Sequence, residues 1–72
     1  MYLEKVNSGS KLKEIRKNKN LTRYDLQKLS GVTTVQIRNI EKGICEPRTT
    51  TLAKLASALE VEYDELYELF YN

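Results

Sequence analysis

Apolar residues recur at helical spacing along the chain, and short polar or glycine-containing stretches separate the repeats. Leu12 and Ile15 form the first pair, between the boundaries Asn7-Ser8-Gly9 and Asn18-Lys19-Asn20. Residues three or four positions apart lie on one side of an α-helix. The pattern therefore predicts a short helix between these two boundaries.

A second helix is predicted between Thr22 and Gly31. The Thr22 hydroxyl can accept a hydrogen bond from a backbone N–H, and Asp25 can reach back to complete a capping box. Leu26 and Leu29 are expected to face inward along this helix. Gly31 can adopt the left-handed backbone conformation that ends a helix.

A third helix follows almost at once, because Thr33 and Gln36 repeat the capping-box spacing just after Gly31. We expect it to run to Gly43, since glycine commonly terminates helices. A turn of about three residues then joins the second and third helices, which is the geometry of a helix-turn-helix.

Two more helices are predicted in the second half of the chain. Pro47 disfavours helix in the residue before it, so the segment "ICEPR" is a loop. The fourth helix starts around Thr49, and its apolar side carries Leu52, Leu55, Ala56 and Leu59. The fifth extends from about Tyr63 to Phe70 and carries Leu66 and Leu69. The sequence thus predicts a compact all-α fold of five helices, with an N-terminal arm over residues 1–8 and one helix-turn-helix domain over residues 9–72.

The third helix has an apolar side and a polar side. At about 100° per residue, Ile37 and Ile40 point one way, with Thr33, Glu41 and Ile44 near them. The opposite side offers hydrogen-bond donors, acceptors and one methyl-bearing side chain within the width of a DNA major groove. We therefore expect contacts with bases from Thr34, Val35, Gln36, Arg38 and Asn39. Taken alone, such a side is more often a plain solvated surface, and it is the short turn between the second and third helices that favours DNA binding.

The start of the second helix is expected to meet the DNA backbone. Free backbone N–H groups at a helix start favour an anion, and Arg23 lies there. Phosphate contacts position a protein without reading sequence. The residues expected to make them are Thr22, Arg23, Thr33, Lys42 and Arg48.

The net charge of +2 is unevenly distributed. Residues 1–57 hold all 12 Lys and Arg against five acids, whereas residues 58–72 hold five acids and no base. A basic body with an acidic end suits binding of a polyanion at one end, although solvated helix faces would give the same pattern.

Composition excludes several classes of protein. The chain has no histidine and one cysteine, so no zinc site of Cys and His ligands and no catalytic constellation can be assembled. Cys45 is expected to be a loop residue without a redox role. No run of 18 apolar residues is present, and Glu4 and Lys5 interrupt any secretion signal, so we expect a cytoplasmic protein without membrane association. We expect no enzymatic activity, cofactor, metal or small-molecule substrate.

The fifth helix carries an aromatic stripe, because Tyr63, Tyr67 and Tyr71 are spaced by four. A chain of 72 residues cannot bury all of this area. The stripe either covers the first helix and the early residues Tyr2, Leu3 and Val6, or meets its copy in a homodimer, which we favour. The expected interface consists of Tyr63, Leu66, Tyr67, Phe70 and Tyr71.

The order of these segments resembles the Cro/CI-type (lambda-repressor-like, XRE family) helix-turn-helix domain of phage repressors and many small bacterial regulators. The resemblance covers residues 12–66 and rests on "KLKEIRKNKNLT", "GVTTVQIRNIEKG", "EP", "LAKLASALEV" and "DEL". It implies a five-helix fold, dimeric binding to palindromic operators and a role in transcription. It also implies a structural ion pair between Arg16 and Glu41.

Four positions depart from the pattern of that family. Gln27 replaces a usual alanine, so either the second and third helices cross more widely or Gln27 extends past their edge. Glu60 replaces a usual glycine, Glu62 replaces a better cap, and Thr49 takes a normally apolar place.

The sequence therefore predicts a sequence-specific regulator of transcription that binds double-stranded DNA. We favour a repressor over an activator, because no separate domain is present to recruit polymerase. The alternative is an antitoxin-type or other protein-interaction module, in which the fifth helix binds a different protein.

Overall fold

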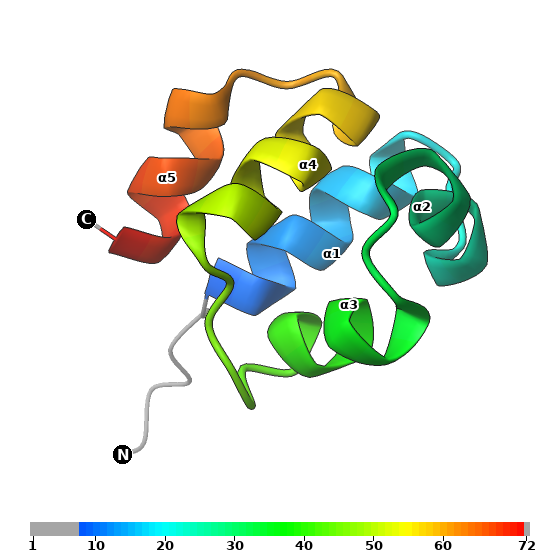
Figure 1. Ribbon diagram of the computed structural model, residues 1–72, viewed down its shortest axis with the longest axis horizontal. Helices are drawn as coiled ribbons and strands as arrows, with labels where there is room; N and C mark the ends of the chain where they lie inside the picture. Colours follow the sequence, from blue (N-terminus) through cyan, green and yellow to red (C-terminus); the bar gives the residue numbers. More distant parts are fainter. Residues whose placement is uncertain (1–7, 72) are drawn as a thin grey trace, which may run out of the picture.

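The computed structural model describes residues 8–71, which form five α-helices (Figure 1). They are α1 (Ser8–Asn18), α2 (Arg23–Ser30), α3 (Thr34–Glu41), α4 (Thr49–Leu59) and α5 (Tyr63–Tyr71). α4 contacts α2 on one side and α5 on the other, and α1 contacts α3 and α5. The predicted all-α fold of five helices is confirmed. Within residues 8–71, every helix is too short or too polar to cross a membrane.

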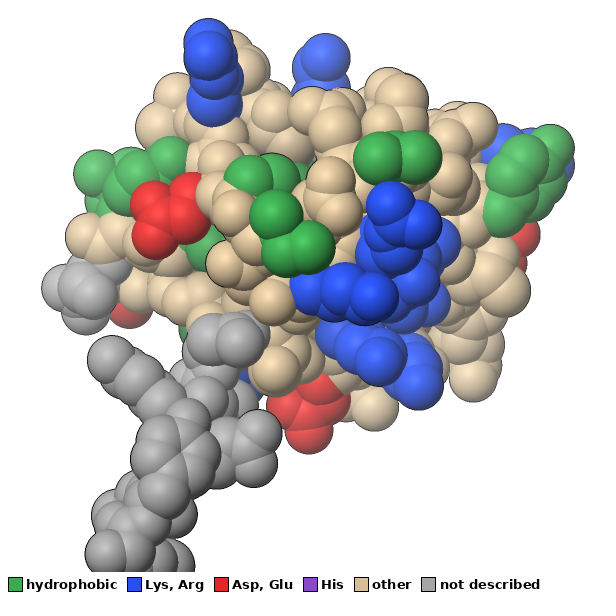
Figure 2. All heavy atoms as spheres, turned by 90° about the horizontal axis from the view of Figure 1, so that it is seen from below, with side chains coloured by type: hydrophobic (Ala, Val, Ile, Leu, Met, Phe, Trp, Pro, Cys, Tyr) green, Lys and Arg blue, Asp and Glu red, His purple; other side chains and the backbone are tan. Residues whose placement is uncertain are grey.

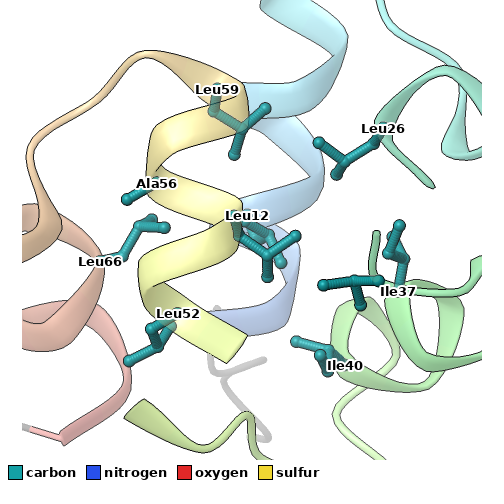
Figure 3. Close-up of a cluster of buried hydrophobic side chains, with 10 residues drawn as sticks. Leu12, Leu26, Ile37, Ile40, Leu52, Ala56, Leu59 and Leu66 are labelled. Atoms are coloured by element: carbon teal, nitrogen blue, oxygen red, sulfur yellow. The ribbon is translucent and has the colours of Figure 1, made fainter. Parts of the chain in front are cut away.

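The core draws side chains from all five helices and from the turn between α2 and α3. Figure 3 shows Leu12 near the middle, with Ile37 and Ile40 of α3 on one side and Leu66 of α5 on the other. The buried apolar residues are Leu12, Leu26, Val32, Ile37, Ile40, Leu52, Leu55, Ala56, Leu59 and Leu66. Because Ile37 and Ile40 of α3 are buried in the core, that side of the helix faces inward and the opposite side faces solvent.

Two residues expected on the inward side are exposed instead. Leu29, in the last turn of α2, is 61% exposed, and the buried apolar side chain at this end of the helix is Val32, which follows Gly31 with its φ of 82°. Ile44 is 68% exposed, because α3 ends at Glu41 and Gly43 has φ 78°. Ile44 therefore lies beyond the end of the helix, and helical spacing no longer determines where its side chain points.

The first helix begins earlier than expected, at Ser8, so it starts inside the segment predicted as an N-terminal arm. The proposed contacts of Tyr2, Leu3 and Val6 lie outside the described residues. Gly9 is buried where α1 meets the end of α3. A Cβ atom at Gly9 would lie 2.6 Å from the carbonyl oxygen of Glu41 and closer still to that of Ile40. The glycine therefore allows two backbones to touch.

In the connection between α4 and α5, a glutamate occupies the position where the family usually has glycine. Glu60 adopts the left-handed conformation with φ 59°, where a side chain is normally disfavoured. Its backbone N–H still donates to the carbonyls of Ala56 and Ser57. Before α5, the Glu65 carboxylate accepts from the Glu62 N–H at 3.2 Å, which is one half of a capping box.

Replacing Gly9 with alanine tests the backbone contact between α1 and α3. Alanine is normally preferred over glycine inside a helix by about 0.5–1 kcal/mol, so a merely helical position would become more stable. We expect instead a loss of about 1–3 kcal/mol in the free energy of unfolding, because the added methyl group forces the helices apart. Urea denaturation followed by circular dichroism measures this, with the exposed Lys17→Ala as control. A gain in stability for Gly9→Ala would show that the close approach is unimportant.

Candidate nucleic-acid interface

The start of α2 is capped as its sequence predicted. The Thr22 hydroxyl accepts from the Asp25 N–H at 3.0 Å, and the Asp25 carboxylate accepts from the Thr22 N–H at 3.0 Å. The hydrogen bond from the Thr22 backbone is the main reason that the pKa of Asp25 lies below its ordinary value of 3.8, and the bond to the Thr22 side chain adds to it. The carboxylate therefore stays ionised beside the positive end of α2.

The turn between α2 and α3 is held by three short hydrogen bonds. The Gly31 N–H donates to the Gln27 carbonyl at 2.8 Å, and the Val32 N–H donates to the Ser30 hydroxyl at 3.0 Å. Ser30 in turn donates to the Leu26 carbonyl at 2.7 Å. With Val32 buried, the turn fixes where α3 must start.

Two side chains cap the start of α3, and only one was anticipated. The Thr33 hydroxyl accepts from the Gln36 N–H at 3.1 Å, as its spacing predicted. The side-chain oxygen of Gln27 accepts from the Thr34 N–H at 2.7 Å. The half-buried side chain of Gln27 thus reaches from α2 to the first residue of α3. Its partner Thr34 lies seven positions away across the turn, and no local sequence pattern indicates such a bond.

The outward side of α3 carries the residues expected to contact bases. Val35 is 54% exposed, Gln36 and Arg38 are exposed, and Thr34 and Asn39 are half-buried. The three remaining residues of the helix, Ile37, Ile40 and Glu41, are buried. The five side chains therefore lie on the side of α3 away from the core.

The residues expected to contact phosphates lie at or next to helix ends. Thr22, Thr33, Lys42 and Arg48 are exposed, and each flanks a helix end: the N-caps of α2, α3 and α4 and the C-cap of α3. Arg23 is partly buried. An open groove at the start of α2 is also basic, with Lys13, Arg16, Lys17 and Arg23 in its lining. Figure 2 looks onto the side where α3 lies and shows Lys and Arg gathered in one patch.

A buried carboxylate joins three helices beneath this surface. The Arg16 Nε of α1 lies 2.7 Å from Glu41 Oε2, and a second Arg16 nitrogen donates to Oε1 at 3.1 Å. Arg23 Nε of α2 donates to the same Oε1 at 3.0 Å. Arg16 also donates to the Leu21 carbonyl at 2.7 Å. The implied pair between Arg16 and Glu41 is thus formed and extended by Arg23, a partner that sequence reasoning had assigned only to phosphate.

The aromatic stripe on α5 is present, but the set of residues expected at a dimer interface needs correction. The ring centroids of Tyr63 and Tyr67 are 5.9 Å apart, and those of Tyr67 and Tyr71 are 5.1 Å apart. Leu66 is fully buried among core residues, so placing it at an interface was wrong. It sits one position before Tyr67, on the side of α5 that packs against the core.

The remaining stripe residues divide between core and surface. Tyr63 and Phe70 are half-buried against the core. Tyr67 and Tyr71 are 41% and 43% exposed, and the Tyr71 hydroxyl donates to the Pro47 carbonyl. The accessible part of the stripe is therefore the edge formed by Tyr67 and Tyr71. Cys45 is exposed in the loop between α3 and α4.

Comparison with known proteins matches this chain to helix-turn-helix regulators. The helix-turn-helix family model HTH_3 matches residues 12–66. Over 59 residues the chain is 37% identical to the uncharacterized HTH-type transcriptional regulator RghRB of Bacillus subtilis (strain 168), covering 81% of this chain and 42% of that protein. It is 34% identical over 58 residues to the uncharacterized HTH-type transcriptional regulator y4dJ of Sinorhizobium fredii, covering 81% and 75%. The chain thus spans less than half the length of RghRB.

Solved structures agree with the sequence matches. The restriction-modification controller protein C.AhdI from Aeromonas hydrophila superposes with a TM-score of 0.80 and 34% identity, covering 85% of this chain and 92% of that one. The P22 c2 repressor, solved in complex with a synthetic operator, gives a TM-score of 0.76 and 30% identity, covering 83% and 91%.

Replacing Arg16 with alanine tests the buried carboxylate. Glu41 would lose two of its hydrogen bonds while remaining enclosed, and breaking one side of a buried pair costs about 3–5 kcal/mol. We expect most of the stability of so small a domain to disappear, measured as a large fall in thermal midpoint. Lys17→Ala, at the next position and exposed, is the control. Equal midpoints for Arg16→Ala and the parent would contradict the assignment.

Proposed function

Because this chain belongs to the HTH_3 helix-turn-helix family of DNA-binding transcription regulators, we propose that it binds a specific duplex operator through α3 and represses transcription as a homodimer. Two of its relatives are named transcriptional regulators. Two structural neighbours are a controller protein and a repressor solved with operator DNA. These neighbours support repression as the activity of this chain.

The observation that carries the proposal is the division of α3 between core and solvent. Ile37 and Ile40 pack into the core. The residues of α3 that are not buried are Thr34, Val35, Gln36, Arg38 and Asn39. Arginine can donate to two acceptors of guanine, asparagine and glutamine can pair with adenine, and a valine methyl group can meet the methyl group of thymine. Arg38, Asn39 and Val35 therefore suit direct reading of base edges in a major groove.

Phosphate contacts are proposed from the residues that flank this helix. The Thr33 hydroxyl accepts a bond as a cap and keeps its own hydrogen to donate to a phosphate, and Thr22 is exposed at the N-cap of α2. Arg23 uses Nε for Glu41 and is still partly exposed, so its terminal nitrogens can face an anion. Lys42 and Arg48 add charge at the two ends of the following loop. Such contacts make affinity fall steeply as salt rises.

The exposed edge of α5 is the proposed contact between two copies. Stacking of Tyr67 on Tyr71 holds both rings in one orientation, so little side-chain entropy remains to be lost on association. A twofold dimer would present two α3 helices to successive major grooves about 34 Å apart, and the operator would then consist of two inverted half-sites. The acids concentrated in residues 58–72 would lie away from the phosphates.

Selection of bound sequences from a random duplex pool tests the proposal directly. We expect one preferred sequence with two inverted half-sites. On that sequence, Arg38→Ala or Asn39→Ala should each weaken binding by about 1–3 kcal/mol, with little change on random DNA. Gel-shift titration measures both affinities. Equal losses on both kinds of DNA would remove these residues from base reading, and a pool without enrichment would refute the function.

Truncating Tyr67 to alanine tests the dimer. The side chain is removed from both copies, so we expect self-association to weaken by about tenfold or more, while the fold is retained because Tyr67 lies outside the core. Sedimentation at micromolar concentration reports the change. Glu68→Gln, on the next residue and also exposed, is the control. A parent chain that sediments as a monomer with and without operator would rule out the homodimer, and co-purification of a different protein on α5 would favour an interaction module.

A further inference from the structure

We propose that Gln27 is a positioning residue for base reading, because its side chain fixes the first turn of α3 relative to α2. The inference rests on the proposed function and deepens it. It assigns a role in specificity to a residue that faces the start of the helix rather than the DNA.

Gln27 is bonded at both ends of the turn. Its backbone carbonyl accepts from the Gly31 N–H at 2.8 Å, where the turn begins. Its side-chain oxygen accepts from the Thr34 N–H at 2.7 Å, where α3 begins. The side chain is half-buried, so this bond is partly shielded from competing water. One residue of α2 thereby sets the separation between the end of its own helix and the start of the next.

The two caps of α3 have different mechanical consequences. The first N–H groups of a helix have no partner within it, and side chains must supply acceptors. Thr33 supplies one to Gln36, but Thr33 immediately precedes α3 and moves with it. Gln27 belongs to α2, so its bond to Thr34 resists movement of α3 relative to α2. The opposite end of α3 is held separately, by Ile40 in the core and by the Glu41 carboxylate.

The bond therefore matters most for the first turn of α3. Val35 lies in that turn, whereas Arg38 lies one turn further along, beyond the buried Ile37. Discrimination between bases requires side chains held to within about 0.5 Å. Without the Gln27 acceptor, the first turn can shift while the second stays anchored. Loss of the bond should relax the choice of base opposite Val35 and leave the choice opposite Arg38 unchanged.

Two variants of matched size separate this role from simple stability. Gln27→Met keeps the length of the side chain and removes the oxygen that accepts from Thr34. Gln27→Glu keeps an acceptor and adds a negative charge. Affinities are measured by gel-shift titration for the operator selected with the parent chain and for every single base-pair substitution of it. Val35→Ala and Arg38→Ala, measured on the same panel, identify the positions that each turn reads.

For Gln27→Met we expect the preference between bases to fall by about tenfold at the positions that Val35→Ala identifies, and to be retained at those that Arg38→Ala identifies. Gln27→Glu should retain the parental pattern at every position. Its added charge should weaken binding to all duplexes by a common factor that shrinks as salt rises. Circular dichroism establishes that both variants are folded at the assay temperature, and Gln27→Ala replaces Gln27→Met if the latter is not.

The inference is overturned if Gln27→Met discriminates as the parent does, or if it loses the same factor on the operator and on random DNA. Either result leaves DNA binding by this chain intact. If the parent chain selects no sequence from the pool, the proposed function and this inference both fail.

Discussion

The arrangement of the first three helices depends on the buried carboxylate of Glu41. Its side chain has no exposed surface, and it receives hydrogen bonds from Arg16 of α1 and Arg23 of α2. An enclosed charge is tolerated only when partners of opposite charge reach it with good geometry. α1, α2 and α3 can therefore pack only in the arrangement that brings both guanidinium groups to the end of α3.

Close backbone contact at the same end of α3 reinforces this constraint. Gly9 lets α1 approach the last carbonyls of α3, next to the residue whose side chain Arg16 holds. The start of α3 is fixed by other means, through the turn and the side chain of Gln27. The start of this eight-residue helix is thus attached to α2, and its end is attached to both α1 and α2. A helix held at both ends can present its outward side in a single orientation.

The success and failure of sequence-based prediction follow the range of the interactions involved. The five helices, the capping box of Thr22 and the turn at Gly31 depend on residues close in sequence, and all were predicted. Ile44 was misplaced because a helical pattern was extended past Glu41, where the helix ends, and Leu29 was misplaced although it lies within α2, because the pattern does not reveal how far the core extends along that helix. Gly9 was read as a boundary because its reason for being glycine lies on another helix. Leu66 was assigned to an interface because the stripe on α5 does not reveal which edge faces the core.

The contacts of the outward side of α3 with DNA stay predictions, since residue type and exposure alone support them.

Under the proposed function, the division of α3 lets one fold read many DNA sequences. Three of its eight residues are buried: Ile37 and Ile40 pack in the core, and Glu41 carries the buried carboxylate. Substitutions at the exposed Val35, Gln36 and Arg38 change surface chemistry and cost little stability, because exposed positions rarely contribute more than about 0.5 kcal/mol. Under the proposed function, stability and base preference are therefore encoded largely by different residues of the same helix. Gln27 is the exception that we propose, since it lies on α2 and its side chain is bonded to the backbone at the start of α3.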